Sequence, residues 1–236
     1  MEWREENGVR WLEADLGGAR AAFSTRLGGV SEAPYDSLNL GLLTEDGAEA
    51  VAENRNRLAA SLGFAPEQVV FARQVHGTDL LHHPREGGVA EADGHVVREP
   101  GLVPLVFVAD CLPVALYGPR GLAMVHAGWR PLAGGILAAA AEAVDATRAA
   151  IGPGIGPCCY EVGDEVRSAF ADLGNVAAGR MLDLPEVARC QLAEAGVAEV
   201  ESAGLCTSCE AGLFFSHRRD DGRTGRQAGL AWIEEG

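Results

Sequence analysis

The chain has 236 residues, of which 47% are hydrophobic and 22% are charged, a composition typical of a globular protein with a sizeable core. Its formal net charge of −15 disfavours binding to nucleic acid, because an acidic surface repels a phosphate backbone. No segment has the apolar length of a membrane span, and the N-terminal residues lack the pattern of a signal peptide. We therefore expect a cytoplasmic protein with neither a nucleic-acid nor a membrane partner.

The basic and sulfur-containing residues restrict the chemistry further. All 19 basic residues are arginine, so Schiff-base chemistry, pyridoxal phosphate attachment and a P-loop lysine are excluded. A bound anion must be held by arginine or by backbone N–H groups. The six cysteines occur without an export signal, which favours metal binding or catalysis over disulfides.

The first third of the chain predicts a hairpin, a strand and a helix. Asn7-Gly8 separates two runs that contain apolar residues, which is a hairpin signal. The segment 21–31 predicts a strand that ends at the Gly28-Gly29 turn. Apolar residues recur at helical spacing over 48–62, where we expect an amphipathic helix.

The middle of the chain is rich in short strands. We expect them at residues 68–76, 95–97, 104–111, 113–118 and 121–127. Several of these runs lack polar alternation, which predicts that both faces of the strands are buried.

The last part of the chain predicts helices and a final strand. We expect a first helix from Pro131 to about residue 148, a Gly/Pro-rich loop that leads into a second helix, and a third helix over 185–196. An Arg-rich loop then precedes the last strand. No repeat, linker or break in composition divides the sequence, so we expect a single α+β domain over residues 1–236.

Three residues at the ends of predicted strands are candidate metal ligands: His76, Cys111 and His126. Two imidazoles and one thiolate suit Zn²⁺ and leave a fourth position open for water or substrate. Their spacing matches no compact zinc motif. The alternative is that the histidines are ordinary hydrogen-bonded residues and that Cys111 is a small buried hydrophobic side chain.

Three other clusters have a functional and a structural interpretation. Cys158-Cys159 and the CxxC of Cys206 and Cys209 could form a four-thiolate zinc site, although only one true CxxC is present. The glycine-rich loop 152–157 could bind an anion or simply turn tightly against its neighbours. A third cluster could clamp a phosphate or a carboxylate, or pair with acidic residues on the surface; it comprises Arg218, Arg219, Arg223 and Arg226.

A series of motifs in fixed order over nearly the whole chain resembles the YfiH family, also called the polyphenol oxidase or laccase-domain family. The matching motifs are STRLGGVS, YDSLNLG, VAENRNRL, RQVHGTD, ADCLPVALYGP, VHAGWRPLAGGIL, IGPGIGPCCYEVG and CTSCEAGLFFSHRRDDGRTGRQ. The resemblance implies an α+β fold with mixed β-sheets flanked by helices, as in cytotoxic necrotizing factor deamidases. It also implies that His76, Cys111 and His126 bind zinc.

The resemblance further implies a zinc-dependent enzyme acting on purine nucleosides. The expected reactions are phosphorolysis of adenosine, inosine, guanosine or methylthioadenosine and deamination of adenosine, with a purine nucleoside and phosphate as partners and a monomeric protein. Copper and a multicopper laccase reaction are disfavoured, because six histidines are too few for the sites required. The expected substrate-binding residues are Arg26, Asn39, Asp93, Trp129 and Arg130, with Asp93 supporting the site or transferring a proton.

Two other functions remain open from the sequence. In the first, Cys111 is a nucleophile activated by His126 in a metal-independent hydrolase or amidase, which the family suggests would edit serine-containing peptidoglycan precursors. In the second, a closed zinc site has only a structural role. One departure from the family stands out: residues 42–47 read LLTEDG where the family commonly has His-Val-Gly-Asp-Asp, which puts substrate contacts from this loop in doubt.

Overall fold

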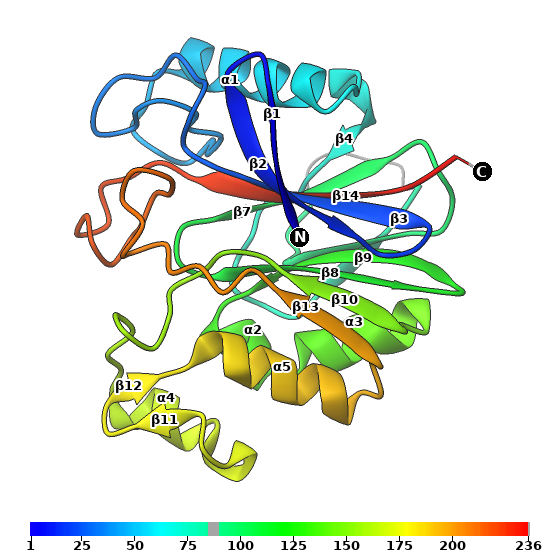
Figure 1. Ribbon diagram of the computed structural model, residues 1–236, viewed down its shortest axis with the longest axis vertical. Coiled ribbons are helices and arrows are strands. Elements are labelled where there is room, and N and C mark those ends of the chain that lie inside the picture. The colour runs from blue at the N-terminus through cyan, green and yellow to red at the C-terminus, as the bar shows by residue number, and fades with distance from the viewer. Residues whose placement is uncertain (85–89, 236) are drawn as a thin grey trace.

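A computed structural model describes residues 1–84 and 90–235 and contains two six-stranded sheets (Figure 1). The first sheet has the order β1-β2-β3-β14-β7-β4. All its neighbouring strands are antiparallel except β7 and β4. The bounds of its strands are Glu2–Glu6 for β1, Val9–Asp15 for β2, Ala19–Ser24 for β3, Val69–Val70 for β4, Val103–Val108 for β7 and Gln227–Ile233 for β14.

The second sheet is also mixed. Its order is β13-β10-β8-β9-β6-β5, with parallel pairs at both edges and antiparallel pairs between them. Its strands are Leu80–His82 for β5, Gly94–Val97 for β6, Leu112–Gly118 for β8, Gly121–Ala127 for β9, Arg148–Ile151 for β10 and Glu199–Ser202 for β13. A small separate ribbon pairs β11 (Ala177–Ala178) with β12 (Met181–Leu182).

Helices cover the outer faces of the two sheets, so the layers run helix, sheet, sheet, helix (Figure 1). Helix α1 (Ala48–Ser61) covers the first sheet, and α2 (Trp129–Ala133), α3 (Ile136–Val144) and α5 (Leu184–Glu194) cover the second. The short helix α4 (Asp164–Ser168) lies beside the β11–β12 ribbon, and single 3₁₀ turns occupy Pro66–Gln68 and Ala171–Leu173. This α+β arrangement of mixed sheets and flanking helices confirms the predicted fold class.

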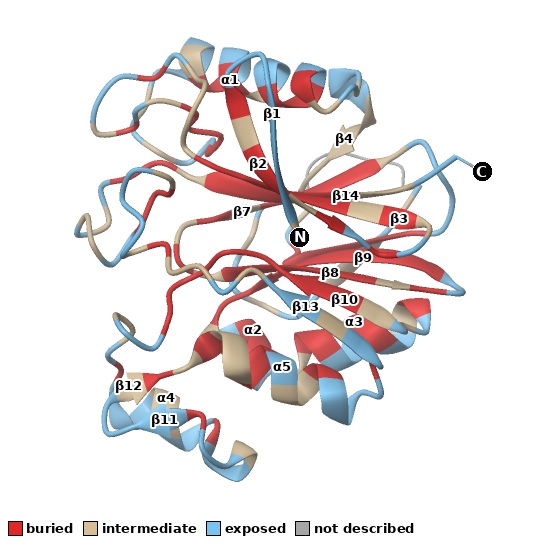
Figure 2. Cartoon of the chain, in the orientation of Figure 1, coloured by how far each residue is buried: buried red, intermediate tan, exposed pale blue. Residues whose placement is uncertain are grey.

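Three apolar cores fill the spaces between these layers, and Figure 2 shows the buried strands at their centre. Strand β9 is buried along its whole length. Because successive side chains alternate across a strand, Leu122 and Met124 enter the core between the sheets while Ala123 and Val125 enter the core beneath α3 and α5. This packing explains why the sequence here lacks polar alternation.

The structure also corrects several predicted elements. The helix expected from Pro131 to residue 148 is two helices, because Gly134 and Gly135 interrupt it and Gly135 has a φ of 84°. Its predicted C-terminal end belongs to strand β10, which together with β13 was not foreseen. The strand expected over 68–76 is limited to Val69 and Val70, and the following residues form a loop. Among the described residues, no helix is long and apolar enough to cross a membrane.

Candidate active site

A cavity of about 660 Å³ opens at the end of the two sheets where strands β7 and β9 finish. Its wall combines aromatic and aliphatic side chains, including Phe71, Phe107 and Ile155, with polar groups that converge on one end. A cavity of this size and mixed character is typical of a small-molecule site. The three candidate metal ligands, His76, Cys111 and His126, all line it.

Each of the three residues is delivered by the end of a strand or by a sharp loop. His126 is the penultimate residue of β9 and is 3% exposed. Cys111 lies in the turn between β7 and β8, next to Asp110, whose φ is 86°. His76 lies in the loop between β4 and β5 with a φ of 58°. The positive φ values mark a backbone held by its surroundings in a sparsely populated conformation.

The side chains of His76, Cys111 and His126 converge so that their donor atoms lie within 4.8 Å of one another. The two imidazole rings meet edge to face with centroids 4.7 Å apart. Gly128 permits this convergence, because a Cβ there would lie 2.8 Å from the Cys111 sulfur. Within the described part of the chain, no fourth His, Cys, Asp or Glu joins the group, as expected for a site that leaves one position to water or substrate.

Asp93 is fully buried behind the site and holds two of its parts in place. Its Oδ1 accepts hydrogen bonds from His126 Nδ1 at 2.7 Å and from the His76 backbone N–H at 3.0 Å. Its Oδ2 accepts hydrogen bonds from the N–H groups of Val75 at 3.1 Å and Gly77 at 2.6 Å. Asp93 thereby sets the backbone around His76 and leaves Nε2 of His126 to face Cys111.

Electrostatics couple these groups. Burial raises the pKa of the Cys111 thiol, but the charge of His126 and hydrogen bonds from both histidines outweigh burial and lower it to about 6. Burial lowers the pKa of His126, but the Cys111 thiolate and the hydrogen bond to Asp93 raise it to about 9. Without a metal the site therefore favours a thiolate–imidazolium pair at neutral pH.

Four arginines line the same cavity, and they differ in how far their own neighbours engage them. Arg73 pairs with Glu91, and the Arg226 guanidinium donates to backbone carbonyls. Arg130 stacks over the ring of Trp129 and has no carboxylate partner in the described segments. Arg218 donates to the Glu161 carbonyl and likewise pairs with no described acidic side chain. Arg130 and Arg218 thus offer the least committed positive charge.

Two predicted substrate-binding residues, Arg26 and Asn39, lie outside the lining of the cavity. Arg26 forms an ion pair with Asp36 and stacks over Phe215. Asn39 is fully buried; its side chain accepts the Arg226 backbone N–H and donates to Asp46. Asp93 does not line the cavity either, and it supports the site from behind. Trp129 and Arg130 do line it.

The arginines of the predicted anion clamp also divide into residues that line the cavity and residues that do not. Arg219 pairs with Asp220 and Arg223 lies 3.9 Å from Glu45, whereas Arg218 and Arg226 line the cavity. In the glycine-rich loop, a Cβ on Gly152 would lie 2.3 Å from Phe23 and one on Gly154 would lie 2.4 Å from Leu112. Close packing therefore explains those two glycines.

Several residues of the site were missed because nothing in their local sequence singles them out. Tyr160 lines the cavity, and burial together with the charge of Cys111 raises its pKa to about 12, so its hydroxyl stays protonated. The Asp110 carboxylate accepts hydrogen bonds from the Thr207 hydroxyl at 2.6 Å and from the Arg218 backbone at 2.7 Å. The loop after Asn39, by contrast, is marked in the sequence by its departure from the family, and it contributes Leu42 and Leu43 to the cavity lining.

The fold and the site together define an α+β protein with a His–Cys–His cluster, suited to a metal ion, at the end of a partly apolar cavity. The chain belongs to the family described as multi-copper polyphenol oxidoreductase laccase, whose model matches residues 20–234, and its relatives identify it as a YfiH-family protein.

Similar proteins cover almost the whole chain. A protein of Escherichia coli named purine nucleoside phosphorylase YfiH is 41% identical over 231 residues, which span 92% of this chain and 94% of that protein. A Pseudomonas aeruginosa protein also named purine nucleoside phosphorylase is 38% identical over 244 residues, covering 95% and 99% of the two chains. The crystal structure of the Bacillus licheniformis hypothetical protein YfiH superposes with a TM-score of 0.89 at 33% identity, covering 98% and 99%.

Proposed function

We propose that this protein is a zinc-dependent purine nucleoside phosphorylase that also deaminates adenosine. The observation that carries the proposal is the juxtaposition, in one cavity, of the His–Cys–His cluster with aromatic walls and uncommitted arginines. The names of relatives at about 40% identity support the same activity. Adenosine, inosine, guanosine and methylthioadenosine are the proposed substrates.

The donor set fits Zn²⁺. Two imidazoles and a low-pKa thiolate are ligands that zinc prefers, and the histidine–carboxylate pair of His126 and Asp93 is a common support for a zinc-bound imidazole. His76, Cys111 and His126 would hold the ion. Bound there, Zn²⁺ supplies Lewis acidity at an open fourth position. Copper chemistry of the laccase type needs more histidines than the six that this chain has.

In phosphorolysis, a phosphate oxygen attacks C1′ of the ribose and the bond from C1′ to the purine nitrogen breaks. The products are ribose 1-phosphate and the free base, which takes up a proton. Arg130 and Arg218 would hold the phosphate, because guanidinium groups match its geometry and neither is paired with a described carboxylate. Phe71, Phe107 and Trp129 offer apolar surface for the purine.

Tyr160, whose hydroxyl stays protonated at neutral pH, lines the same cavity and would donate a hydrogen bond to the substrate. In deamination, water replaces the amino group at C6 of adenosine and ammonia leaves, giving inosine. The base must then sit with C6, rather than C1′, toward the cluster. Two substrate orientations in one cavity account for the two reactions.

The alternative hydrolase shares some of this geometry. Cys111, His126 and Asp93 are arranged as nucleophile, base and orienting carboxylate, which is the pattern of a cysteine amidase. The names of the relatives favour the nucleoside reaction over this alternative. The two mechanisms respond oppositely to metal removal, because a bound metal would block the thiolate nucleophile.

The test is a product assay by mass spectrometry. Protein loaded with zinc is incubated with adenosine, with and without phosphate, beside chelated protein and the His126→Ala variant. We expect adenine and ribose 1-phosphate only with phosphate, and inosine in both conditions, with both activities lost on chelation and in the variant. His82→Ala is the matched control, since that exposed histidine lies outside the cavity. Nucleoside turnover that survives chelation would contradict the zinc dependence, and no nucleoside turnover by the zinc-loaded protein would contradict the proposal and favour the amidase.

A further inference from the structure

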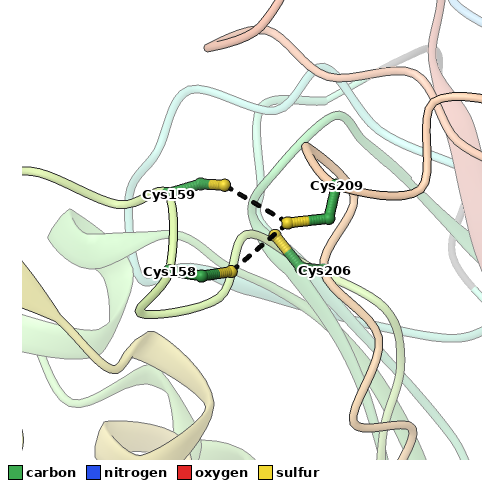
Figure 3. A group of neighbouring side chains, drawn as sticks. All are labelled: Cys158, Cys159, Cys206 and Cys209. Carbon is green, nitrogen blue, oxygen red and sulfur yellow. Dashed lines mark hydrogen bonds between the residues drawn. The ribbon is translucent and has the colours of Figure 1, made fainter.

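Four cysteines outside the proposed active site form a second cluster. The sulfur atoms of Cys158, Cys159, Cys206 and Cys209 all lie within 4.8 Å of one another. Figure 3 shows the four side chains pointing toward a common centre from two separate loops. Cys209 is the closest to the others, with its sulfur 3.4 Å from those of both Cys158 and Cys159.

The two loops that supply these cysteines are far apart in sequence but held together in space. The first joins β10 to α4 and the second joins β13 to β14. An isolated parallel bridge pairs Gly154 with Cys206, and the Thr207 N–H donates to the Gly154 carbonyl at 3.0 Å. The backbone therefore fixes where the cysteines meet.

The spacing of the sulfurs fits a shared metal ion and not a covalent bond. In a tetrahedral site with Zn–S bonds of about 2.3 Å, neighbouring sulfurs are about 3.8 Å apart. The closest sulfur pairs here are 3.4 Å apart and the others lie no further than 4.8 Å, whereas a disulfide needs about 2.05 Å. Small changes in these S–S distances would bring the four sulfurs to the spacing of a tetrahedral site.

The surroundings of Cys206 are suited to a thiolate. The backbone N–H group of Gly156 donates a hydrogen bond to its sulfur at 3.3 Å, and neighbouring N–H groups lower the pKa of this thiol. Such bonds withdraw charge from a metal-bound thiolate and orient it. A complex of four thiolates with a divalent ion carries a net charge of −2. The Arg219 guanidinium, which is paired with Asp220, donates to the carbonyls of Thr207 and Ser208 and so fixes the backbone of the loop that carries Cys206 and Cys209.

We propose that these four cysteines form a second, structural metal site that binds Zn²⁺ or a similarly thiophilic divalent ion. Binding displaces four thiol protons, and the closed set of four ligands leaves no position for substrate. By coordinating cysteines from both loops, the ion would cross-link them. In the described structure, a short β-bridge and a few hydrogen bonds otherwise link the loops at this point.

The position of this cluster gives it a consequence for the cavity. Tyr160 follows Cys159 directly and Arg218 belongs to the same loop as Cys209, and both line the cavity. The Arg218 guanidinium carbon lies 5.3 Å from the centre of the Tyr160 ring. The metal would thus hold together two parts of the cavity wall that are far apart in the sequence: the loop that carries Tyr160 and the loop that carries Arg218.

The first test counts metal ions in the purified full chain by plasma mass spectrometry after growth with zinc. We expect two zinc ions in the wild type and one in a Cys206→Ser/Cys209→Ser variant. A His76→Ala/Cys111→Ser variant, which lacks the other cluster, should also keep one. Exchanged with Co²⁺, that variant should show the intense visible and near-ultraviolet bands of a tetrahedral four-thiolate complex. Cys190→Ser is the matched control, since Cys190 on α5 lies outside both clusters.

A second measurement uses the wild type and does not depend on the folding of any variant. Cys158 and Cys209 are exposed, so as free thiols they are accessible to iodoacetamide. Bound to metal, they should be protected at least tenfold until a strong chelator is added, while the rate at Cys190 should not change. Zinc-loaded protein with these thiols fully reactive, or a His76→Ala/Cys111→Ser variant that binds no metal, would overturn the proposal. Neither readout involves a nucleoside, so the result is independent of the proposed enzymatic activity.

Discussion

Replacing Asp93 with asparagine tests how the site is held together. The carboxylate is fully buried and accepts four hydrogen bonds, two at each oxygen. Burial raises the pKa of Asp93, but hydrogen bonds from His126 and from the N–H groups of Gly77 and Val75 outweigh it, so the net shift is downward. The native group is therefore an anion, and asparagine removes both its charge and one of its acceptor oxygens.

The size of the effect follows from the hydrogen bonds lost. If the remaining oxygen stays with His126 and the His76 backbone, the new NH₂ group faces the N–H groups of Val75 and Gly77. Two hydrogen bonds to a charged acceptor are then lost, at about 1.5–3 kcal/mol each, which gives roughly 3–6 kcal/mol in the free energy of unfolding. Because Asp93 also orients His126, we expect zinc affinity at the His–Cys–His cluster to fall about 10- to 100-fold.

Urea unfolding of the chelated protein measures the first quantity, and competition with a chromophoric chelator measures the second. Asp79→Asn is the matched control, since Asp79 is exposed and lies on the β4–β5 loop that carries His76, and we expect it to change neither. Both effects should appear in Asp93→Asn while the far-ultraviolet circular dichroism stays native. A variant with zinc affinity within twofold of the wild type would refute the role we assign to this carboxylate.

Three further predictions concern the same cavity. Gly128→Ala should abolish zinc binding at the His–Cys–His cluster, because the added Cβ would lie 2.8 Å from the Cys111 sulfur. Gly163→Ala is the control and should leave the zinc content unchanged, because a Cβ added there would have no neighbouring atom within 4 Å. Equal zinc content in the two variants would contradict the packing argument. In metal-free protein the rate of alkylation of Cys111 should rise with pH through a midpoint of about 6, because the thiolate is the reactive form and the pKa of this thiol is lowered. The pKa of Cys190 is raised, so its alkylation rate should still be rising above pH 9. A midpoint near 9 for Cys111 would refute its coupling to His126. Leu43→Asp should raise KM for nucleosides several-fold with little change in kcat, because this side chain is 83% exposed on the cavity wall; an unchanged KM in steady-state assays would show that the loop does not contact substrate.

The candidate ligands and two of the candidate substrate-binding residues lie in equally distinctive motifs but in different places in the structure. The three candidate ligands could be proposed from the sequence because each follows a recognisable apolar run and carries a metal-binding side chain. Arg26 and Asn39 lie in motifs just as distinctive, yet their side chains hold loops together outside the cavity. A motif shows that a residue matters without showing which neighbour it serves.

The sequence by itself determined the α+β class, the buried character of the central strands, the absence of lysine chemistry and the residue types available to a metal. Those properties depend on composition and on local periodicity. Only the tertiary structure decided that Asp93 backs both His76 and His126, that Tyr160 and Arg218 share one cavity with them, and that the four remaining clustered cysteines meet. The physical reason is that each of these contacts joins segments tens of residues apart, whose distance is set by the pairing of strands in two sheets and leaves no local mark on the sequence.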